Sequence, residues 1–388
     1  MRQLNARLTV VVAAVAVAAV AGGGVFAYRQ GPQTSTADAS PLGGQPSTVP
    51  SLTPSSKPPA TPSVTPPPPS ASKPGMTGPR TVPVNLAKLT QGRTPQLVHS
   101  LGRKISGGPD QAFTAPGKDR IIAAAQAGSS TYVLESREPD LVLVRTSNSG
   151  DSSEVRDVTT LVGAVDASFA AFASQKQKPT GEQLAGSTLY AEDGGAEKYK
   201  LSLPSSWNVQ VIAVAAGKVY YASTPKEDGV PKLYSWVPGE SSATTVKGIN
   251  SPTAVSDDGT LVAAADISDS GSCSYVTELA TGKRLWRTCE YMIKGFTPDK
   301  SAFIAGPSYE DGYAALDSWL IDGKTFAPLR QWTGVSFRQV RAEDDQHLLM
   351  EVDDGPDTKG AIIRCEIPTG DCERATPITP GDQFGLGS

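Results

Sequence analysis

A pattern of two short apolar runs, each bounded by turn residues, returns six times between Lys118 and Gly370. The first run of each repeat starts 48, 50, 42, 41 or 46 residues after the one before it, at 121–125, 169–173, 219–222, 261–265, 302–305 and 348–352. A later turn glycine recurs at spacings of 45, 44, 43, 41 and 47, at Gly150, Gly195, Gly239, Gly282, Gly323 and Gly370. A period of about 40 to 50 residues with several short strands predicts an all-β fold, a β-propeller with one sheet, or blade, per repeat.

Four of the repeats carry an aspartate three positions before the first run, at Asp166, Asp258, Asp299 and Asp345. An aspartate side chain accepts a hydrogen bond from the backbone two residues later, which suits a tight turn entering a strand. The other two repeats have Lys118 and Ala216 at this position, so the repeat is degenerate.

The number of blades follows from the length of the repeat. The glycine landmarks are 44 residues apart on average, and the 306 residues of 83–388 therefore hold about seven repeats. A partial repeat lies at 95–102, before the six complete ones. Because unpaired edge strands invite aggregation, we expect 83–106 to complete a last blade together with the C-terminal segment. Seven blades are predicted, and six are the alternative.

The N-terminal residues predict a membrane segment and a linker. After a short tail at 1–7, residues 8–28 carry no charge and are long enough to span a bilayer as a signal anchor. The basic residues Arg2 and Arg7 place the tail in the cytoplasm and the domain at 83–388 outside. The alternative is a cleaved signal peptide and a secreted protein. Residues 29–82 are rich in Pro, Ser and Thr and predict a disordered linker.

Charge argues against a nucleic-acid partner. The chain has a formal net charge of −4, and 81–388 carries 29 basic against 38 acidic residues. A domain of this balance lacks the basic stripe that phosphate binding requires.

The four cysteines flank two predicted hairpin turns. Cys273 and Cys289 are equidistant from residue 281, and Cys365 and Cys372 are equidistant from 368–369. Residues equidistant from a hairpin turn face each other across the strands, so we expect disulfides within each pair. The alternative is four buried thiols. The spacing does not fit a zinc site.

Signatures of chemistry are scarce. The chain has two histidines, His99 and His347, and lacks the motifs of nucleophilic hydrolases, zinc proteases, P-loop proteins and dinucleotide-binding proteins. Residues 256–260 resemble the Asp-box turn of sialidases, but the tryptophan that ends that motif is missing, so we interpret them as a structural hairpin. We expect no metal and no cofactor.

Two short patterns resemble known propeller families. Residues 279–286 resemble the Thr-Gly-x-x-x-Trp ending of pyrroloquinoline-quinone-type blades, which implies that Trp286 docks neighbouring blades and does not imply a quinone. The turns at 256–259 and 297–300 are similar to those of TolB-like and WD-repeat-like propellers of bacterial envelopes. This second resemblance covers most of 110–378 and implies a rigid interaction platform. The alanine-rich composition suggests, by analogy, an actinobacterial surface protein.

These observations favour a non-enzymatic binding or scaffold module for an extracytoplasmic protein, peptide or envelope polymer. A propeller-class hydrolase or lyase and the ectodomain of a membrane sensor are the alternatives. Because the first strand of each blade should line the central channel, we expect Asn250, Lys294 and Arg338 to rim a funnel and meet an anionic group. Ordinary solvated side chains are the competing interpretation.

The linker assignment gives a first prediction. Limited proteolysis of the intact protein should release a resistant fragment that begins near residue 80, because 31–80 should make few contacts with the folded domain. N-terminal sequencing of the fragment checks this. A first cut inside 83–388 would contradict the assignment.

Overall fold

The computed structural model describes residues 75–387 apart from 79, 110–111, 139, 148–149, 179–182, 196, 269–270, 310–312, 356–357 and 382. The predicted tail, membrane segment and most of the linker, at 1–74, lie outside the described residues. Within the described part of the chain, no helix is both long and apolar enough to cross a membrane.

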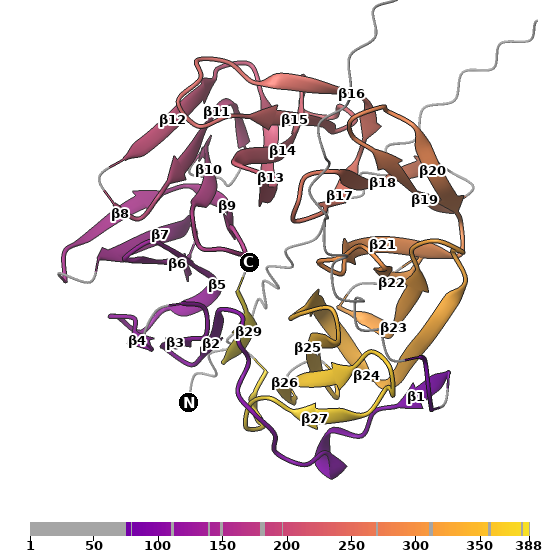
Figure 1. The fold of residues 1–388 in the computed structure, drawn as a ribbon. Helices are drawn as coiled ribbons and strands as arrows, with labels where there is room; N and C mark the ends of the chain where they lie inside the picture. Colours follow the sequence, from indigo (N-terminus) through magenta and orange to yellow (C-terminus); the bar gives the residue numbers. More distant parts are fainter. Residues whose placement is uncertain are drawn as a thin grey trace, which may run out of the picture. The chain divides into compact units, whose positions relative to one another are not determined.

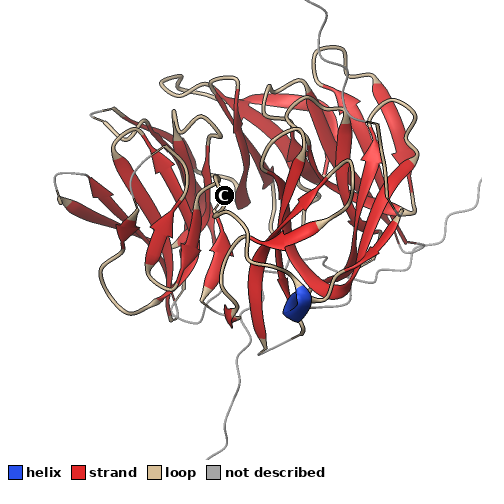
Figure 2. Ribbon diagram, turned by 60° about the horizontal axis from the view of Figure 1, so that its bottom comes forward, coloured by secondary structure: helices blue, strands red, loops and turns tan. Residues whose placement is uncertain are grey.

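The described residues form twenty-nine strands and one short 3-10 helix, η1 (Leu86–Lys88), the blue turn in Figure 2. One four-stranded sheet contains β5 (Arg120–Ala127), β6 (Ser130–Arg137), β7 (Asp140–Ser147) and β8 (Ser152–Arg156). The next contains β9 (Val158–Gly163), β10 (Ala170–Gln177), β11 (Gln183–Glu192) and β12 (Lys198–Leu203). A third contains β13 (Trp207–Ala215), β14 (Lys218–Thr224), β15 (Lys232–Trp236) and β16 (Thr244–Asn250). A fourth contains β17 (Pro252–Val255), β18 (Leu261–Ser268), β19 (Gly271–Glu278) and β20 (Arg284–Thr288).

A nine-stranded sheet follows, and one long strand runs through its middle. Its path is β21 (Tyr291–Phe296), β22 (Ala302–Pro307), β23 (Ala315–Asp322), β24 (Pro328–Ala342), β25 (His347–Asp353), β26 (Lys359–Glu366) and β27 (Cys372–Arg374), with β1 (Thr81–Pro83) and β28 (Thr379–Pro380) at its side. The 15-residue β24 pairs mainly with β23 through its first half and with β25 through its second half. One strand therefore serves two successive groups of strands.

The last sheet joins the two ends of the described chain. It contains β29 (Phe384–Leu386), β2 (His99–Leu101), β3 (Lys104–Ser106) and β4 (Phe113–Thr114). The C-terminal β29 pairs antiparallel with β2, in register His99 to Leu386 and Leu101 to Phe384. The predicted closure of a sheet by both ends is confirmed, but its N-terminal strands lie within 99–114 rather than 83–106.

The sheets form a ring, as Figure 1 shows. The innermost strands contact one another in sequence: β5 with β9, β9 with β13, β13 with β17, β17 with β21, β21 with β24, and β29 with both β25 and β5. Clusters of buried apolar side chains fill the interfaces between successive groups of strands around this circuit. A closed circuit of twisted sheets around a centre is the β-propeller architecture.

The second strand of most sheets is buried on both faces because a neighbouring sheet covers each face. β14, β22 and β25 are nearly continuous runs of buried residues, whereas the outer strands β8 and β20 are largely exposed. Strands buried on both faces read as unbroken apolar runs, and these are the runs that mark the repeat in the sequence.

Tryptophans at the outer strands connect neighbouring groups. Trp286 on β20 stacks on Phe326, with ring centroids 5.1 Å apart, and lies 6.1 Å from Phe303. Phe303 lies on β22 of the next sheet, and Phe326 lies in the turn between its strands β23 and β24. Trp332 on β24 donates a hydrogen bond from Nε1 to the carbonyl oxygen of Gly370, at 3.3 Å. The docking role that the resemblance implied for Trp286 is confirmed.

The glycine landmark is correct in every complete repeat: each of the six glycines lies in the turn between the third and fourth strands. The aspartate turns also form as expected, and in three of them the side chain accepts a hydrogen bond from the backbone two residues later, at Asp166, Asp258 and Asp299. Asp345 instead accepts a hydrogen bond from the Asp299 backbone N–H, at 2.9 Å, and so ties two turns together.

The first repeat was aligned wrongly. Residues 121–125 lie on β5, the innermost strand of its sheet, whereas the other five apolar runs lie on second strands. Lys118 precedes β5 and is not in the equivalent turn, and the partial repeat at 95–102 ends in the turn between β2 and β3. The alanine-rich sequence of β5 resembles that of the second strands, and this similarity caused the error.

The chain contacts the sheets before residue 83. The Thr77 N–H donates to the Pro368 carbonyl oxygen at 2.7 Å, and Arg330 Nη2 donates to the Thr77 carbonyl oxygen, also at 2.7 Å. β1 then pairs in parallel with the first half of β24 rather than joining the closing sheet. Thr77 therefore already contacts the sheets, and the resistant fragment should begin a few residues upstream of 80.

Both predicted disulfides are present. Cys273 at the middle of β19 bonds to Cys289, just past β20, and Cys365 on β26 bonds to Cys372 on β27. No cysteine in the described chain is left as a thiol. Such bonds persist in oxidising compartments, which is consistent with an extracytoplasmic location.

The disulfides predict a measurable loss of stability on reduction. The bridges close loops of 16 and 7 residues, so the chain-entropy relation gives about 3 and about 2 kcal/mol respectively. Denaturant unfolding of the paired variants Cys273→Ala/Cys289→Ala and Cys365→Ala/Cys372→Ala measures each contribution. Because Cys365 is also part of the buried core, its pair should lose additional packing energy. Equal stability with and without reductant would contradict the expectation.

Candidate functional site

A cavity of about 330 Å³ opens at the centre of the ring. Its walls come from the innermost strands β9, β13, β17, β21 and β24, with further residues from β22 and β23. Apolar side chains such as Ile212, Phe296 and Ile304 form much of the wall, and polar groups are interspersed among them. This mixture and this volume are typical of a small-ligand or peptide recess.

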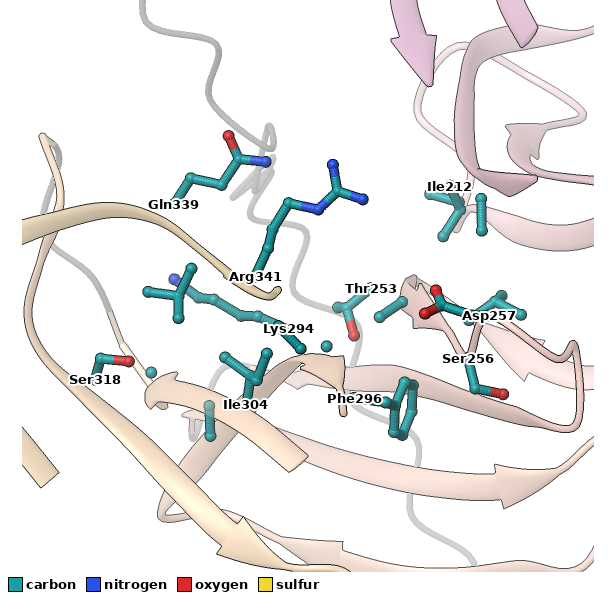
Figure 3. Close-up of a pocket in the computed structure, with 18 of the residues that line it drawn as sticks. Ile212, Thr253, Ser256, Asp257, Lys294, Phe296, Ile304, Ser318, Gln339 and Arg341 are labelled. Carbon is teal, nitrogen blue, oxygen red and sulfur yellow. The ribbon is translucent and has the colours of Figure 1, made fainter. Parts of the chain in front are cut away.

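Five charged residues line the cavity: Lys294, Arg338, Arg341, Asp257 and Asp317. Figure 3 shows Lys294, Gln339 and Arg341 on one side and Asp257, beside Ile212, on the other. The wall therefore carries charges of both signs. A ligand that combines a polar or dipolar group with apolar surface fits such a wall.

Asp257 and Arg341 form an electrostatic pair across the cavity. Loss of hydration raises the pKa of the Asp257 carboxyl, and the Arg341 guanidinium opposes that rise. Burial in turn lowers the pKa of Arg341, which donates a hydrogen bond to the carbonyl oxygen of Gly387. Asp257 is exposed to the cavity, although the surrounding protein reduces its hydration. The ionised form of Asp257 is therefore less stable than that of a fully hydrated surface carboxylate.

Arg338 lines the cavity, and its guanidinium is already paired. Its Nε lies 2.5 Å from Asp353 Oδ2, and its Nη1 lies 3.7 Å from Glu351 Oε1. It also donates to the hydroxyl of Tyr313 and to the carbonyl of Gly381. These partners come from β25 and from the segments before β23 and β29. Arg338 acts first as a connector of the ring and has little capacity left for a ligand.

Glu351 links this cluster to the closing strand. Its Oε2 accepts a hydrogen bond from the Leu386 backbone N–H at 3.2 Å. Burial raises the pKa of Glu351, while the bond from Leu386 and the charge of Arg338 oppose the rise.

The three predicted funnel residues are thus divided. Lys294 and Arg338 line the cavity, as their place on innermost strands suggested. Asn250 ends β16, is exposed and is not among the lining residues; its backbone contacts the Tyr275 hydroxyl instead. A binding role for any of them stays a prediction. The sequence analysis missed both Asp257, which it interpreted only as part of a structural hairpin at 256–260, and Arg341, which lies three residues after Arg338 on β24.

Neither histidine lines the cavity. His99 is buried on β2, where its Nδ1 lies 3.0 Å from the Leu97 carbonyl oxygen and burial lowers its pKa. His347 begins β25, and its Nδ1 lies 2.9 Å from Asp344 Oδ1. Residues 256–260 form the tight turn between β17 and β18, in which Ser256 Oγ donates to Asp258 Oδ1 at 2.8 Å. Among the described residues, no group of three or more His, Cys, Asp or Glu could hold a metal ion.

Neither a family model nor a curated protein matches the sequence. Solved propeller structures are similar at low identity. TolB from Acinetobacter baumannii aligns over 61% of this chain and 66% of its own, just under two thirds, with 10% identity and a TM-score of 0.40. The β-propeller domain of the Trilobed protease from Pyrococcus furiosus aligns over 67% of this chain and 98% of its own, with 9% identity and a TM-score of 0.43. A prolyl endopeptidase aligns over 76% of this chain and 50% of its own, with 11% identity and a TM-score of 0.49. The propeller assignment rests on the strand topology.

The buried carboxyl of Glu351 predicts a pH effect. Because its pKa is raised, the Glu351 carboxyl binds a proton more tightly in the folded state than in the unfolded state. The contribution of Glu351 to the free energy of unfolding therefore falls as the pH rises above 4.5, the pKa of this carboxyl in the unfolded chain. Glu351→Gln keeps the acceptor for Leu386 and cannot ionise. The stability of this variant relative to the natural protein should therefore be greater at pH 8 than at pH 5. Denaturant unfolding at both pH values measures this, with Glu366→Gln at an exposed carboxylate as the control. If the difference in stability between Glu351→Gln and the natural protein were the same at pH 5 and pH 8, the raised pKa of Glu351 would be contradicted.

Proposed function

We propose that the chain is a seven-bladed β-propeller. Each of the five four-stranded sheets is one blade, and the nine-stranded sheet divides at β24 into two more. The seven clusters of buried apolar residues support this division, since each fills one interface between successive blades. The cluster that contains Leu320, Trp332 and Met350 is the interface within the nine-stranded sheet.

We further propose that the propeller lies outside the cell and is tethered through residues 8–28 by a linker that begins at residue 29 and ends before Thr77, where the chain contacts the sheets. The apolar sequence of 8–28, its basic flank and the two disulfides support this location.

The function that the geometry supports best is binding, without chemistry, of a segment of an extracytoplasmic protein, a peptide or an envelope polymer. The observation that carries this proposal is the central cavity, whose wall combines apolar side chains with charges of both signs. Lys294 lies on the innermost strand β21 and is exposed to the cavity, where it favours an anionic group on the ligand.

A hydrolase or lyase is the second candidate, and Asp257 is the observation that favours it. A carboxyl with a raised pKa in a cavity is a common general acid. Turnover of a bound polymer that Asp257→Asn abolishes without loss of affinity would favour this candidate over simple binding.

A matched pair of charge reversals tests the binding proposal. Fragment 75–388 contains every apolar cluster and both disulfides, and its affinity for acidic peptides and fractionated envelope polymers can be measured by interferometry. Lys294→Glu should weaken the interaction at least about tenfold, the effect of 1.4 kcal/mol, and raised salt should weaken it in the natural protein. Lys200→Glu, on the outermost strand β12, is the control and should bind normally. Equal losses in both variants would contradict a role for the cavity.

A further inference from the structure

A second, smaller cavity of about 60 Å³ adjoins the central one. We call it the annex. It lies among the loop before β2, the loop after β3, the turn between β9 and β10, and β5. Four residues line both spaces: Leu97, Gly163, Val165 and Arg341. A group bound in the central cavity can therefore extend into the annex past the Arg341 side chain.

The annex is lined by the side chain of Gln126, near the end of β5. Gln126 is 2% exposed, and neither its Oε1 nor its Nε2 has a hydrogen-bond partner among the described residues. Buried amides are almost always paired, because an unsatisfied donor or acceptor loses its hydration without replacement. Whatever occupies the annex must therefore supply both an acceptor and a donor to this one amide.

Gly108 lies close to the Gln126 amide. A Cβ atom at Gly108 would lie 2.3 Å from Gln126 Oε1, and Gly108 has a φ of +69°, which side chains rarely adopt. Glycine at this position thus permits the turn between β3 and β4 to close over the amide. Because Gly108 has no side chain, space remains beside the Gln126 amide that a larger residue would fill.

We propose that the annex binds the carboxamide of a ligand whose remaining atoms lie in the central cavity; this deepens the proposed function and rests on it. A carboxamide has a carbonyl oxygen for Gln126 Nε2 and an adjacent N–H for Gln126 Oε1. A carboxylate provides acceptors alone and would place a negative charge against Oε1, and an alkyl group provides neither. The volume holds only a group of a few atoms, about the space of two water molecules.

The probe for the annex is propionamide, with propionate and 2-butanone as molecules of similar size that lack the N–H donor. Thermal unfolding of fragment 75–388 should show a saturable rise in Tm with propionamide and not with the other two, since a ligand that binds the folded state stabilises it. Gln126→Leu should abolish the rise. Gln175→Leu is the control: Gln175 is a fully buried glutamine on β10 that lines neither cavity, and the response should remain.

A second measurement keeps the test decisive if Gln126→Leu fails to fold. With glutamine side chains labelled with ¹⁵N, propionamide should shift the Gln126 amide signals, and Gly108→Ala should weaken that response at least about tenfold because its methyl group displaces the amide. No saturable response to propionamide in the natural protein would overturn the proposal and leave water as the occupant. An equal response to all three probes would also overturn it.

Two peptides distinguish whether the carboxamide is a C-terminal amide or a glutamine side chain. A peptide that ends in a primary amide and a peptide with an internal glutamine and a carboxylate end should both require Gln126 if they bind, and their relative affinities identify the favoured source. Failure of the small amides would leave the Lys294 experiment unaffected, so the two proposals can fail separately.

Discussion

The pairing of β2 with β29 is the constraint on which the rest of the structure depends. Three residue pairs connect the N-terminal and C-terminal parts of the folded chain. Without them, β2 and β25 would face solvent, and the apolar cluster that contains Leu349, Phe384 and Leu386 would lose one side. Unpaired strand edges and exposed apolar faces are both unfavourable, so closure stabilises every blade indirectly.

The side chains around the cavity contribute to this closure. Arg338 contacts the segment before β29, Glu351 accepts a hydrogen bond from Leu386, and Arg341 donates to Gly387. Residues that line the cavity, or that are paired with a lining residue, therefore also contact the C-terminal strand β29 and its flanking residues. A change in the charges of the cavity should therefore alter the stability of the pairing between β2 and β29. The contacts just named couple the two places.

The long strand β24 carries two of the charged residues that line the cavity. Other neighbouring blades are joined by turns or loops, whereas here one continuous strand passes from one group to the next. Arg338 and Arg341 lie on its second half, and Trp332 anchors its first half through Gly370. Sites that lie on regular strands are held more precisely than sites on loops.

The periodicity of the sequence predicted the sheets because strands buried on both faces must be apolar throughout. The same rule explains the error at 121–125, since the innermost strand β5 is alanine-rich and reads like a second strand. The disulfides were predictable because each lies within one hairpin, where sequence distance determines the pairing. The isolation of the Gln126 amide was not, because the cavity around it is formed by segments far apart in the sequence. The pairing of Arg338 with Asp353 lies within one hairpin, but the register of that hairpin shifts between Phe337 and Gln339, and spacing alone does not reveal the shift.

The contacts of Thr77 and β1 have a mechanical consequence. A force that reaches Thr77 from its N-terminal side acts first on its hydrogen bonds to Pro368 and Arg330, and then on the parallel pairing of β1 with β24. The strand β2, which follows β1 in the chain and closes the ring, would carry tension after these contacts had broken. The propeller is thus protected from being pulled open at its seam.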